Sequence, residues 1–308
     1  MSRFPLGSLW RLRGISAKDV AAKTLKSLIN DRVFGHAAEL GFYFLFAVFP
    51  TLVCASSILG LAAKSASQFY DKLLDYLTFV IPTAALGTVL STFNETTTTA
   101  SSSKVTFGLI ATVWSASVGI SAIQDTLNAA YKLEDSRSYI VAKIQAIGLT
   151  IVLTVVVTFG LASLLIGDYI ARLSEHRIQY SVMRYAAAGA VRFTSWMIAG
   201  TVLALTFEIL YYCAPDRKSR RWHWSTPGGM IGIAGWLLAS LSFRIYLHLF
   251  NNFTVTYGSL GAVIILLMWF YITGLMLLLG AEINGQIEAA MARRVLQQRA
   301  SSKQFPTS

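Results

Sequence analysis

Charged residues are scarce in this chain. Asp, Glu, Lys and Arg make up 13% of its 308 residues, whereas 55% are hydrophobic. Soluble domains carry about 25% charged residues, so a soluble fold of this length would leave a large apolar surface facing water. The composition therefore excludes a soluble globular protein and predicts a single domain embedded in a membrane.

Residues that bind metals or form disulfides are also few. There are two cysteines, Cys54 and Cys213, and four histidines, which lie far apart along the chain. None of them has the spacing of a metal site, and a disulfide is not expected. The motifs G-x-S-x-G, H-E-x-x-H and C-x-x-C are absent, as is a glycine-rich phosphate loop. We therefore expect no metal, no cofactor and no catalytic residue, and a protein that is not an enzyme.

Long apolar runs are what the chain has in abundance. Six predominantly apolar stretches are each close to the roughly 20 residues that cross a bilayer as a helix. They cover approximately residues 40–63, 105–127, 144–170, 187–212, 227–249 and 260–283. The prediction is an all-α polytopic membrane protein with six transmembrane helices.

The basic residues are distributed unevenly between the loops. The formal net charge is +11, and 18 of the 26 Lys and Arg residues lie before the first span, in loops 128–143 and 213–226, or in the tail. Loops 64–104 and 168–184, which alternate with these, carry six. This asymmetry is the positive-inside pattern and predicts that both termini are cytoplasmic. It explains the charge better than nucleic-acid binding does, so no nucleic-acid partner is expected.

These assignments divide the chain into three parts. Residues 1–35 are expected to form a cytoplasmic basic amphipathic segment, residues 36–285 the six-span membrane domain, and residues 286–308 a cytoplasmic basic tail. The first 30 residues lack the apolar core and cleavage site of a signal peptide. Their apolar residues recur at helical spacing, which predicts either a helix on the membrane surface or one packed on the bundle.

Residues 76–94 are ambiguous, because they are uncharged and long enough to form a seventh span. If they crossed the membrane, every later loop would change sides and two basic loops would face outward. We therefore favour a non-spanning helical segment on the outer face between the first two spans.

Ionisable side chains within spans cost a few kcal/mol to insert and mark candidate functional sites. The acidic ones, of which Glu39 and Glu282 are the closest to the boundary, lie near cytoplasmic ends, and the two arginines lie toward the outer face. They either line an inner polar cavity and an outer pocket for an anionic head group, or they are helix-end residues that snorkel and pair. The substrate-pathway candidates are Asp125, Asn128, Glu208, Arg192, Arg244 and Glu282. Among them, Asp125 and Glu208 are candidates for responding to a proton or cation.

Small residues mark places where helices approach closely. Gly228 and Gly232 lie four residues apart after Pro227, which suits the first turn of a helix. Their expected role is packing, with a substrate groove as the alternative. A second cluster, Tyr257-Gly-Ser-Leu-Gly-Ala262, predicts either a bend that shapes the outer end of the last two spans or a tight helix connection. The packing and conformational candidates are Pro50, Tyr257, Gly258, Gly261, Gly228 and Gly232.

Several strings together resemble the YihY/BrkB family of bacterial inner-membrane proteins, formerly labelled ribonuclease BN. They are His36–Pro50, Trp114-Ser-Ala-Ser117 followed by Asn128-Ala-Ala-Tyr131, Pro215-Asp-Arg217, Tyr257–Ala262 and Leu279-Gly-Ala-Glu-Ile-Asn284. The resemblance runs from about residue 20 to 290 and implies six spans in the inner membrane and, for some members, an association with virulence. It implies no established biochemical activity, and the short loops here give the ribonuclease label no support.

The expected function is transporter-like handling of a lipid or other amphiphilic anion, with Arg192 and Arg244 contacting the anionic head group. Membrane lipids are the expected partners, together with a second copy of the chain or another envelope protein. The alternative is a non-transporting scaffold for envelope integrity or virulence. Tolerance of neutralising substitutions at the charged span residues would distinguish the two.

Overall fold

The fold is entirely helical over the residues that the structure describes. The structure is a computed structural model, and it describes residues 17–61, 102–177, 181–216, 226–249 and 260–304. Within these ranges the chain forms seven α-helices and no strand. They are α1 (Ala17–Asn30), α2 (Val33–Leu61), α5 (Ser102–Ala130), α6 (Tyr139–Arg177), α7 (Ser181–Cys213), α8 (Pro227–Leu249) and α10 (Leu260–Gln304). The predicted all-α class is thereby confirmed.

Five of the described helices are long and apolar enough to cross a bilayer. Their apolar segments are Thr106–Ala130, Tyr139–Ser174, Tyr185–Cys213, Pro227–Leu249 and Leu260–Arg293, and they coincide with the second to sixth predicted spans. α2 covers most of the first predicted span, but its described apolar segment, Val33–Val48, is shorter. The sixth crossing therefore stays a prediction. Residues 76–94, Tyr257 and Gly258 lie outside the described ranges.

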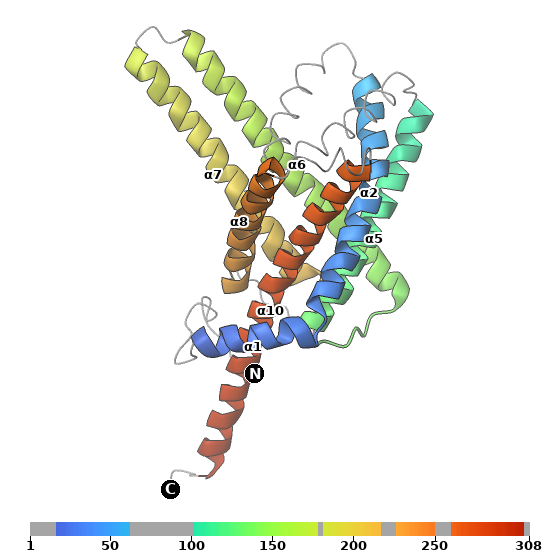
Figure 1. Ribbon diagram of the computed structural model, residues 1–308, viewed down its shortest axis with the longest axis vertical. Coiled ribbons are helices and arrows are strands. Elements are labelled where there is room, and N and C mark those ends of the chain that lie inside the picture. Colours follow the sequence, from blue (N-terminus) through green and yellow to red (C-terminus); the bar gives the residue numbers. More distant parts are fainter. Residues whose placement is uncertain (1–16, 62–101, 178–180, 217–225, 250–259, 305–308) are drawn as a thin grey trace.

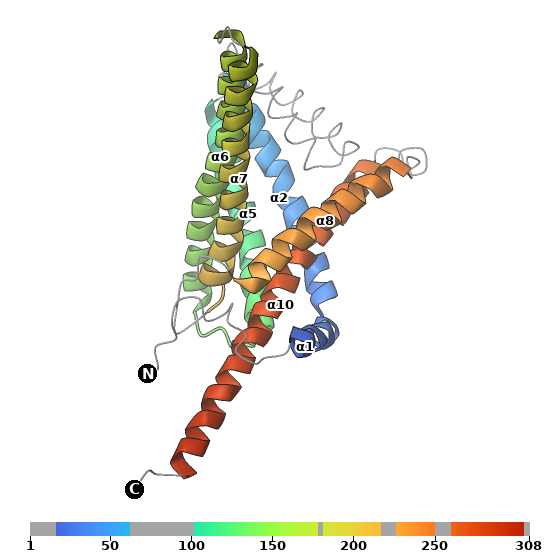
Figure 2. The same ribbon diagram turned by 90° about the vertical axis from the view of Figure 1, so that its left-hand side faces the viewer.

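The longest helix, α10, is the element on which the bundle is assembled. It packs against α2, α8, α1 and α5, while α6 lies along α7 and α2 along α5. The α6–α7 pair diverges from the α2–α5 pair (Figure 1), and α8 and α10 lean together away from α6 and α7 (Figure 2). At one end of the bundle α1 crosses beside α10, together with the α5–α6 loop and the start of α8 (Figure 1). We refer to this end as the α1 end.

The helix α1 packs on the bundle through one face only. Its buried residues Val20, Thr24 and Ser27 face α10, where Val20 meets Ile287. On its other faces Leu25 and Ile29 are 67% and 73% exposed. The two predictions for this segment are therefore compatible, because a packed helix keeps apolar residues available to a membrane surface.

The end of α10 differs from the expected boundary at residue 286. The helix runs without interruption to Gln304, so the predicted tail begins inside a continuous helix. Residues 286–304 contain neither proline nor glycine and are rich in Ala, Gln and Arg. These residues favour helix propagation, and no stop signal is present.

Three glycines of α10 each allow a different neighbouring helix to approach closely. A Cβ at Gly274 would lie 3.1 Å from the Leu40 Cβ of α2, and one at Gly285 would lie 2.9 Å from the Ala130 carbonyl of α5. A Cβ at Gly280 would overlap the Tyr211 hydroxyl of α7. Since lipid supplies no hydrophobic drive between helices, such close backbone approach is a main source of packing energy.

The closest approach joins α8 to α10. A Cβ at Gly228 would overlap the carbonyl oxygen of Gly280, and one at Gly232 would lie 3.1 Å from the carbonyl of Met276. Further along, the Trp236 Nε1–H donates to the Thr273 hydroxyl at 3.1 Å. The structure thus places both predicted glycines at a backbone contact between helices. Gly261 is buried in the first turn of α10.

Pro50 lies inside α2 without ending it. A proline removes one backbone hydrogen bond from the helix. The adjacent carbonyls have side-chain donors, since the Thr51 hydroxyl donates to the Ala47 carbonyl at 2.7 Å and the Thr112 hydroxyl of α5 donates to the Pro50 carbonyl at 2.8 Å. The second of these bonds joins α5 to α2 at the proline.

Substitution of Gly280 by alanine tests the backbone contact. Gly280→Ala is expected to destabilise the protein by about 1–3 kcal/mol, because the added methyl has only backbone and a fixed tyrosine hydroxyl to displace. Gly189→Ala is the matched control, because a Cβ there meets nothing within 4 Å and should be neutral or stabilise by about 0.5–1 kcal/mol. Equal thermal unfolding midpoints for the two variants in detergent would contradict the packing assigned here.

Candidate functional site

Glu208 of α7 lies at the N-terminus of α8 and binds it. Its Oε1 accepts hydrogen bonds from the Thr226 amide at 2.7 Å and the Thr226 hydroxyl at 2.8 Å. Asn284 of α10 completes the group: its Oδ1 accepts from the Gly228 amide at 2.8 Å, and its Nδ2 donates to the Thr226 hydroxyl at 2.9 Å. We call Glu208, Thr226, Gly228 and Asn284 the α8 joint. All four are buried.

The α8 joint caps a helix that starts inside the protein. Thr226 is the N-cap, because its hydroxyl also accepts from the Gly229 amide at 3.1 Å and its carbonyl accepts from Met230. Pro227 takes the first helical position, where no amide hydrogen is needed. The Glu208 carboxylate faces the positive end of the α8 dipole. This arrangement supports the helix-end interpretation of Glu208.

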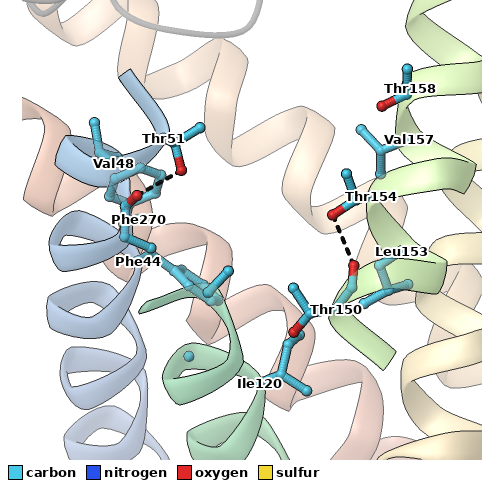
Figure 3. A pocket seen from close by; sticks show the side chains of 13 residues that line it. Phe44, Val48, Thr51, Ile120, Thr150, Leu153, Thr154, Val157, Thr158 and Phe270 are labelled. Carbon is cyan, nitrogen blue, oxygen red and sulfur yellow. Dashed lines mark hydrogen bonds between the residues drawn. The ribbon is translucent and has the colours of Figure 1, made fainter. Parts of the chain in front are cut away.

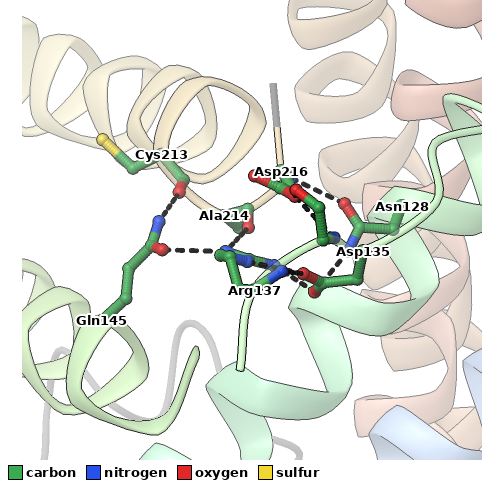
Figure 4. Close-up of polar contacts among 8 residues, drawn as sticks. Asn128, Asp135, Arg137, Gln145, Cys213, Ala214 and Asp216 are labelled. Atoms are coloured by element: carbon green, nitrogen blue, oxygen red, sulfur yellow. Dashed lines mark hydrogen bonds and ion pairs between the residues drawn. The ribbon is translucent and has the colours of Figure 1, made fainter. Parts of the chain in front are cut away.

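A second polar group fastens the α5–α6 loop to the end of α7 (Figure 4). Asn128 of α5 donates to Asp135 at 3.0 Å and accepts from the Asp216 amide at 2.7 Å. The amide and hydroxyl of Ser136 donate to Asp216 at 2.8 and 2.7 Å. Arg137 pairs with Asp135 through its guanidinium. We call Asn128, Asp135, Ser136, Arg137 and Asp216 the loop clamp.

The loop clamp also caps the C-terminus of α7. Arg137 donates to the Ala214 carbonyl at 3.2 Å and to Gln145 at 2.8 Å, and Gln145 in turn donates to the Cys213 carbonyl. Terminal carbonyls of a helix lack partners within that helix, so these donors satisfy them. Asn128, a predicted pathway residue, therefore serves here as a link between two loops.

Ionisation states in the loop clamp are set by its own hydrogen bonds. Hydrogen bonds from Arg137 hold the pKa of Asp135 below its usual value, and the same pairing raises the pKa of Arg137. Hydrogen bonds from Ser136 lower the pKa of Asp216. All three groups are therefore charged near neutral pH.

The remaining acidic candidates at the α1 end are in contrasting surroundings. Asp125 is exposed on α5. Glu39 is also exposed and lies 3.4 Å from the Nδ1 of His36 one turn earlier. Glu282 of α10 is 0% exposed, and neither of its carboxylate oxygens has a hydrogen-bond partner. The structure thus separates the acidic residues that the sequence grouped together.

The two arginines toward the other end lie on different helices. Arg192 of α7 lies 3.8 Å from Asp168 of α6, whose other oxygen accepts from the Arg172 Nε at 2.8 Å. These three side chains carry a net positive charge. Arg244 is exposed on α8. Arg192 therefore links α6 to α7 through Asp168.

An apolar cleft of about 490 Å³ opens between α2 and α6, with α5 as its floor and Phe270 of α10 at its side (Figure 3). Three threonines of α6 spaced four residues apart, Thr150, Thr154 and Thr158, line one wall. The hydroxyls of Thr150 and Thr154 donate to carbonyls of their own helix at 2.8 Å. The other lining side chains are apolar except Thr51. The cleft therefore offers a largely apolar surface in which the hydroxyls of Thr51, Thr150 and Thr154 are bonded to helix carbonyls.

Sequence reasoning missed several members of these groups. Thr226, Asp135, Arg137 and Asp216 were not among the candidates, because their partners lie far away in sequence or within a loop. A local signal existed for Thr226, since a threonine before Pro-Gly-Gly at the start of an apolar run has the pattern of an N-cap followed by proline. No metal-binding group of three His, Cys, Asp or Glu side chains occurs within the described residues.

The fold and these groups define a multi-pass helical membrane protein. A family model described as virulence factor BrkB matches residues 24–304. This match covers almost the whole chain, so the chain belongs to the BrkB family, as the sequence resemblance indicated.

The curated relatives agree with this family. A ribonuclease-like protein, YfkH, of Bacillus subtilis is 33% identical over 248 residues, which are 80% of this chain and 87% of the relative. UPF0761 membrane proteins of Xanthomonas campestris and Xanthomonas oryzae are 23% and 24% identical, over 86% of this chain. The chain spans 59% of the length of these Xanthomonas proteins. No solved structure matches this chain.

Removal of the Thr226 hydroxyl tests the α8 joint. Thr226→Ala is expected to lower the free energy of unfolding by about 0.5–2 kcal/mol, the usual effect of losing an N-cap. Thr201→Ala is the control, because that exposed threonine bonds only to the Met197 carbonyl of its own helix. Unfolding midpoints in detergent measure the difference. If the two variants have the same unfolding midpoint, Thr226 is not the cap of α8.

The loop clamp should open in acid. Because the folded-state pKa of Asp135 is depressed, its contribution to stability is present above the unfolded value of about 3.9 and is lost as pH falls through the lower folded value. Hydrogen exchange of residues 131–138 should therefore accelerate below about pH 4. Asp135→Asn should exchange quickly at neutral pH and lose this pH dependence. Slow, unchanged exchange in the variant would show that the ion pair does not hold the loop.

Proposed function

We propose that this BrkB-family protein is a transporter-like protein that moves a lipid or amphiphilic anion across or within the bacterial inner membrane. The observation that carries the proposal is the apolar cleft between α2 and α6. Its volume of about 490 Å³ lies within the usual range for ligand pockets of about 300–1,000 Å³. The proposed role is non-enzymatic.

The chemistry of the cleft fits an alkyl chain. Its lining is apolar apart from threonines, and the described hydroxyl bonds run to carbonyls of the same helix. A polar ligand would find few unsatisfied partners there. Nearby residues of α6, including Val155 and Phe159, are exposed at 64% and 63%, as expected of a surface that faces lipid. The proposed occupant is therefore the acyl chain of a membrane lipid.

The positive charge at the other end of α6 suits an anionic head group. Asp168 lies ten residues beyond Thr158, which is about 15 Å along a helix. There Arg172 and Arg192 both contact Asp168, and guanidinium groups bind phosphate through a planar fork of donors. Arg192 is thus the proposed contact for the head group, with Arg244 as a second contact from α8.

The proposed orientation places the α1 end in the cytoplasm. The segments that gather there include the α5–α6 loop and the C-terminal part of α10 (Figure 1). The chain segments assigned to this side carry 18 of its 26 basic residues, and cytoplasmic loops are enriched in such residues. Both termini are then cytoplasmic, with Arg192 and Arg244 toward the outer leaflet.

A lipid-movement assay tests the proposal. Wild type is reconstituted into vesicles of phosphatidylethanolamine and phosphatidylglycerol that contain a fluorescent phosphatidylglycerol, and dithionite then bleaches the outer-leaflet label. Wild type is expected to move the labelled phosphatidylglycerol from the inner to the outer leaflet, where dithionite bleaches it. This bleaching should be faster than in vesicles that contain fluorescent phosphatidylcholine instead. Thr154→Trp should slow this by about tenfold, equivalent to about 1.4 kcal/mol in the barrier, because the indole fills the cleft.

Val155→Trp is the matched control, because this neighbouring α6 residue is exposed and outside the cleft lining. It should behave as wild type. If wild type moves neither lipid, or if both tryptophan variants remain fully active, the cleft is not a lipid path. The non-transporting envelope scaffold would then be the better description.

A further inference from the structure

The most unusual polar side chain of the described structure is Glu282. It is 0% exposed, and both of its carboxylate oxygens lack hydrogen-bond partners. A carboxylate that is buried without a partner costs many kcal/mol, and such groups usually become neutral instead. The carboxylate oxygens of Glu282 therefore need a binding partner that is not a side chain of this protein.

The surroundings of Glu282 are polar at one side. Ser27 of α1 and Gln286 of α10 lie close enough to act on its carboxyl group, and the Gln286 amide donates to the Ser27 hydroxyl at 2.8 Å. Thr24, on the same buried face of α1, also has an unpartnered hydroxyl. The contact between α1 and α10 is thus polar around Glu282 and apolar where Val20 meets Ile287.

Two charged groups act on Glu282 in opposite directions. Asp31 follows α1, and Lys132 follows α5. Their side chains lie 3.8 Å apart as an ion pair. The ammonium of Lys132 is therefore already matched by a carboxylate, so Glu282 has no cation of its own.

The other elements packed on α10 bring no further charge to this position. On α2, His36 and Glu39 lie close to each other. On α5, Asp125 interacts electrostatically with Glu39, Asp135, Arg137 and His36. Glu282 is not one of its partners in this set. The basic residues Lys23 and Lys26 of α1 are exposed, and Arg244 and His248 of α8 lie toward its far end.

We propose that Glu282 is a proton-binding site, which holds a proton at neutral pH where α1 packs on α10. A proton satisfies the site because it needs only one oxygen. A Mg²⁺ or Ca²⁺ ion would need six or more oxygen ligands, and it would compete with the ammonium of Lys132. The neighbouring side chains of Asp31 and Lys132 are 23% and 65% exposed, so water reaches the edge of this contact.

The consequence of proton loss follows from the burial. An ionised Glu282 would place a second negative charge near Asp31 in a dry contact, which is strongly unfavourable without a partner. Separation of α1 from α10 would admit water and relieve this. The proton therefore stabilises the packed position of α1. This inference does not depend on the transport proposal.

Infrared spectroscopy of the purified full-length protein tests the proposal directly. A protonated carboxylic acid has a carbonyl stretch that a carboxylate lacks. Wild type at pH 7 is expected to show this band, and Glu282→Gln to lose it. Glu39→Gln is the matched control, since Glu39 is an exposed carboxyl at the same end of the bundle, and it should keep the band. An identical carbonyl region in wild type and Glu282→Gln would overturn the proposal.

Isotope labelling keeps the test independent of whether the variant folds. Wild type made with ¹³C-carboxyl glutamate should show the same band shifted to lower frequency, still present well above the ordinary glutamate pKa of about 4.3. Absence of any protonated glutamate at pH 7 would overturn the proposal. Lipid movement is not measured here, so failure of the transport assay leaves this result unaffected.

Hydrogen exchange gives the conformational readout. The amides of α1 are expected to exchange faster as pH rises above neutral in wild type, after correction for the intrinsic pH dependence. Glu282→Gln mimics the protonated form in shape and charge, so its α1 protection should not change with pH. A parallel loss of α1 protection in both proteins would show that Glu282 does not control this contact.

Discussion

Direct backbone contact between α8 and α10 is the constraint on which the rest of the bundle depends. In a bilayer the lipid tails are as apolar as the helices, so helices associate through close packing and hydrogen bonds rather than through the hydrophobic effect. The mutual overlap that any Cβ at Gly228 or Gly280 would cause shows how close the two backbones are. This proximity brings Asn284 to the first turn of α8 and places Tyr211 where its hydroxyl donates to the Leu277 carbonyl at 2.8 Å.

Polar groups at the α1 end fall into two kinds. Those of the α8 joint and the loop clamp have defined partners and fix helix ends, in keeping with the strong requirement for satisfied polar groups in a low-dielectric environment. Glu282 differs, because it is fully buried and its carboxylate oxygens have no hydrogen-bond partner of that geometry. Buried polar groups without partners are rare enough to require an explanation. That contrast separates residues that hold the structure from one that is suited to bind something.

The helices could be predicted closely from the sequence, and their side-chain partners could not. α8 was expected and found at residues 227–249, because proline marks its start and its apolar run is uninterrupted. The helix α10 extends to Gln304, past the predicted span 260–283, because helix-forming residues continue its last turns. Asn284 and Thr226 are separated by 58 residues, and pairing over such a distance depends on tertiary packing that hydrophobic periodicity does not encode. The same holds for Asn128 and Asp216.

The length of α10 makes it a rigid arm. Its 45 residues correspond to about 68 Å, roughly twice the thickness of a bilayer's hydrocarbon core. About 33 Å of this separates Glu282 from the last helical residue at 1.5 Å per residue. A rotation of about 10° near Glu282 would therefore sweep the distal tip through about 6 Å, given that rise per residue. A change too small to alter the packing of the spans is thereby magnified into a displacement that a neighbouring molecule would register.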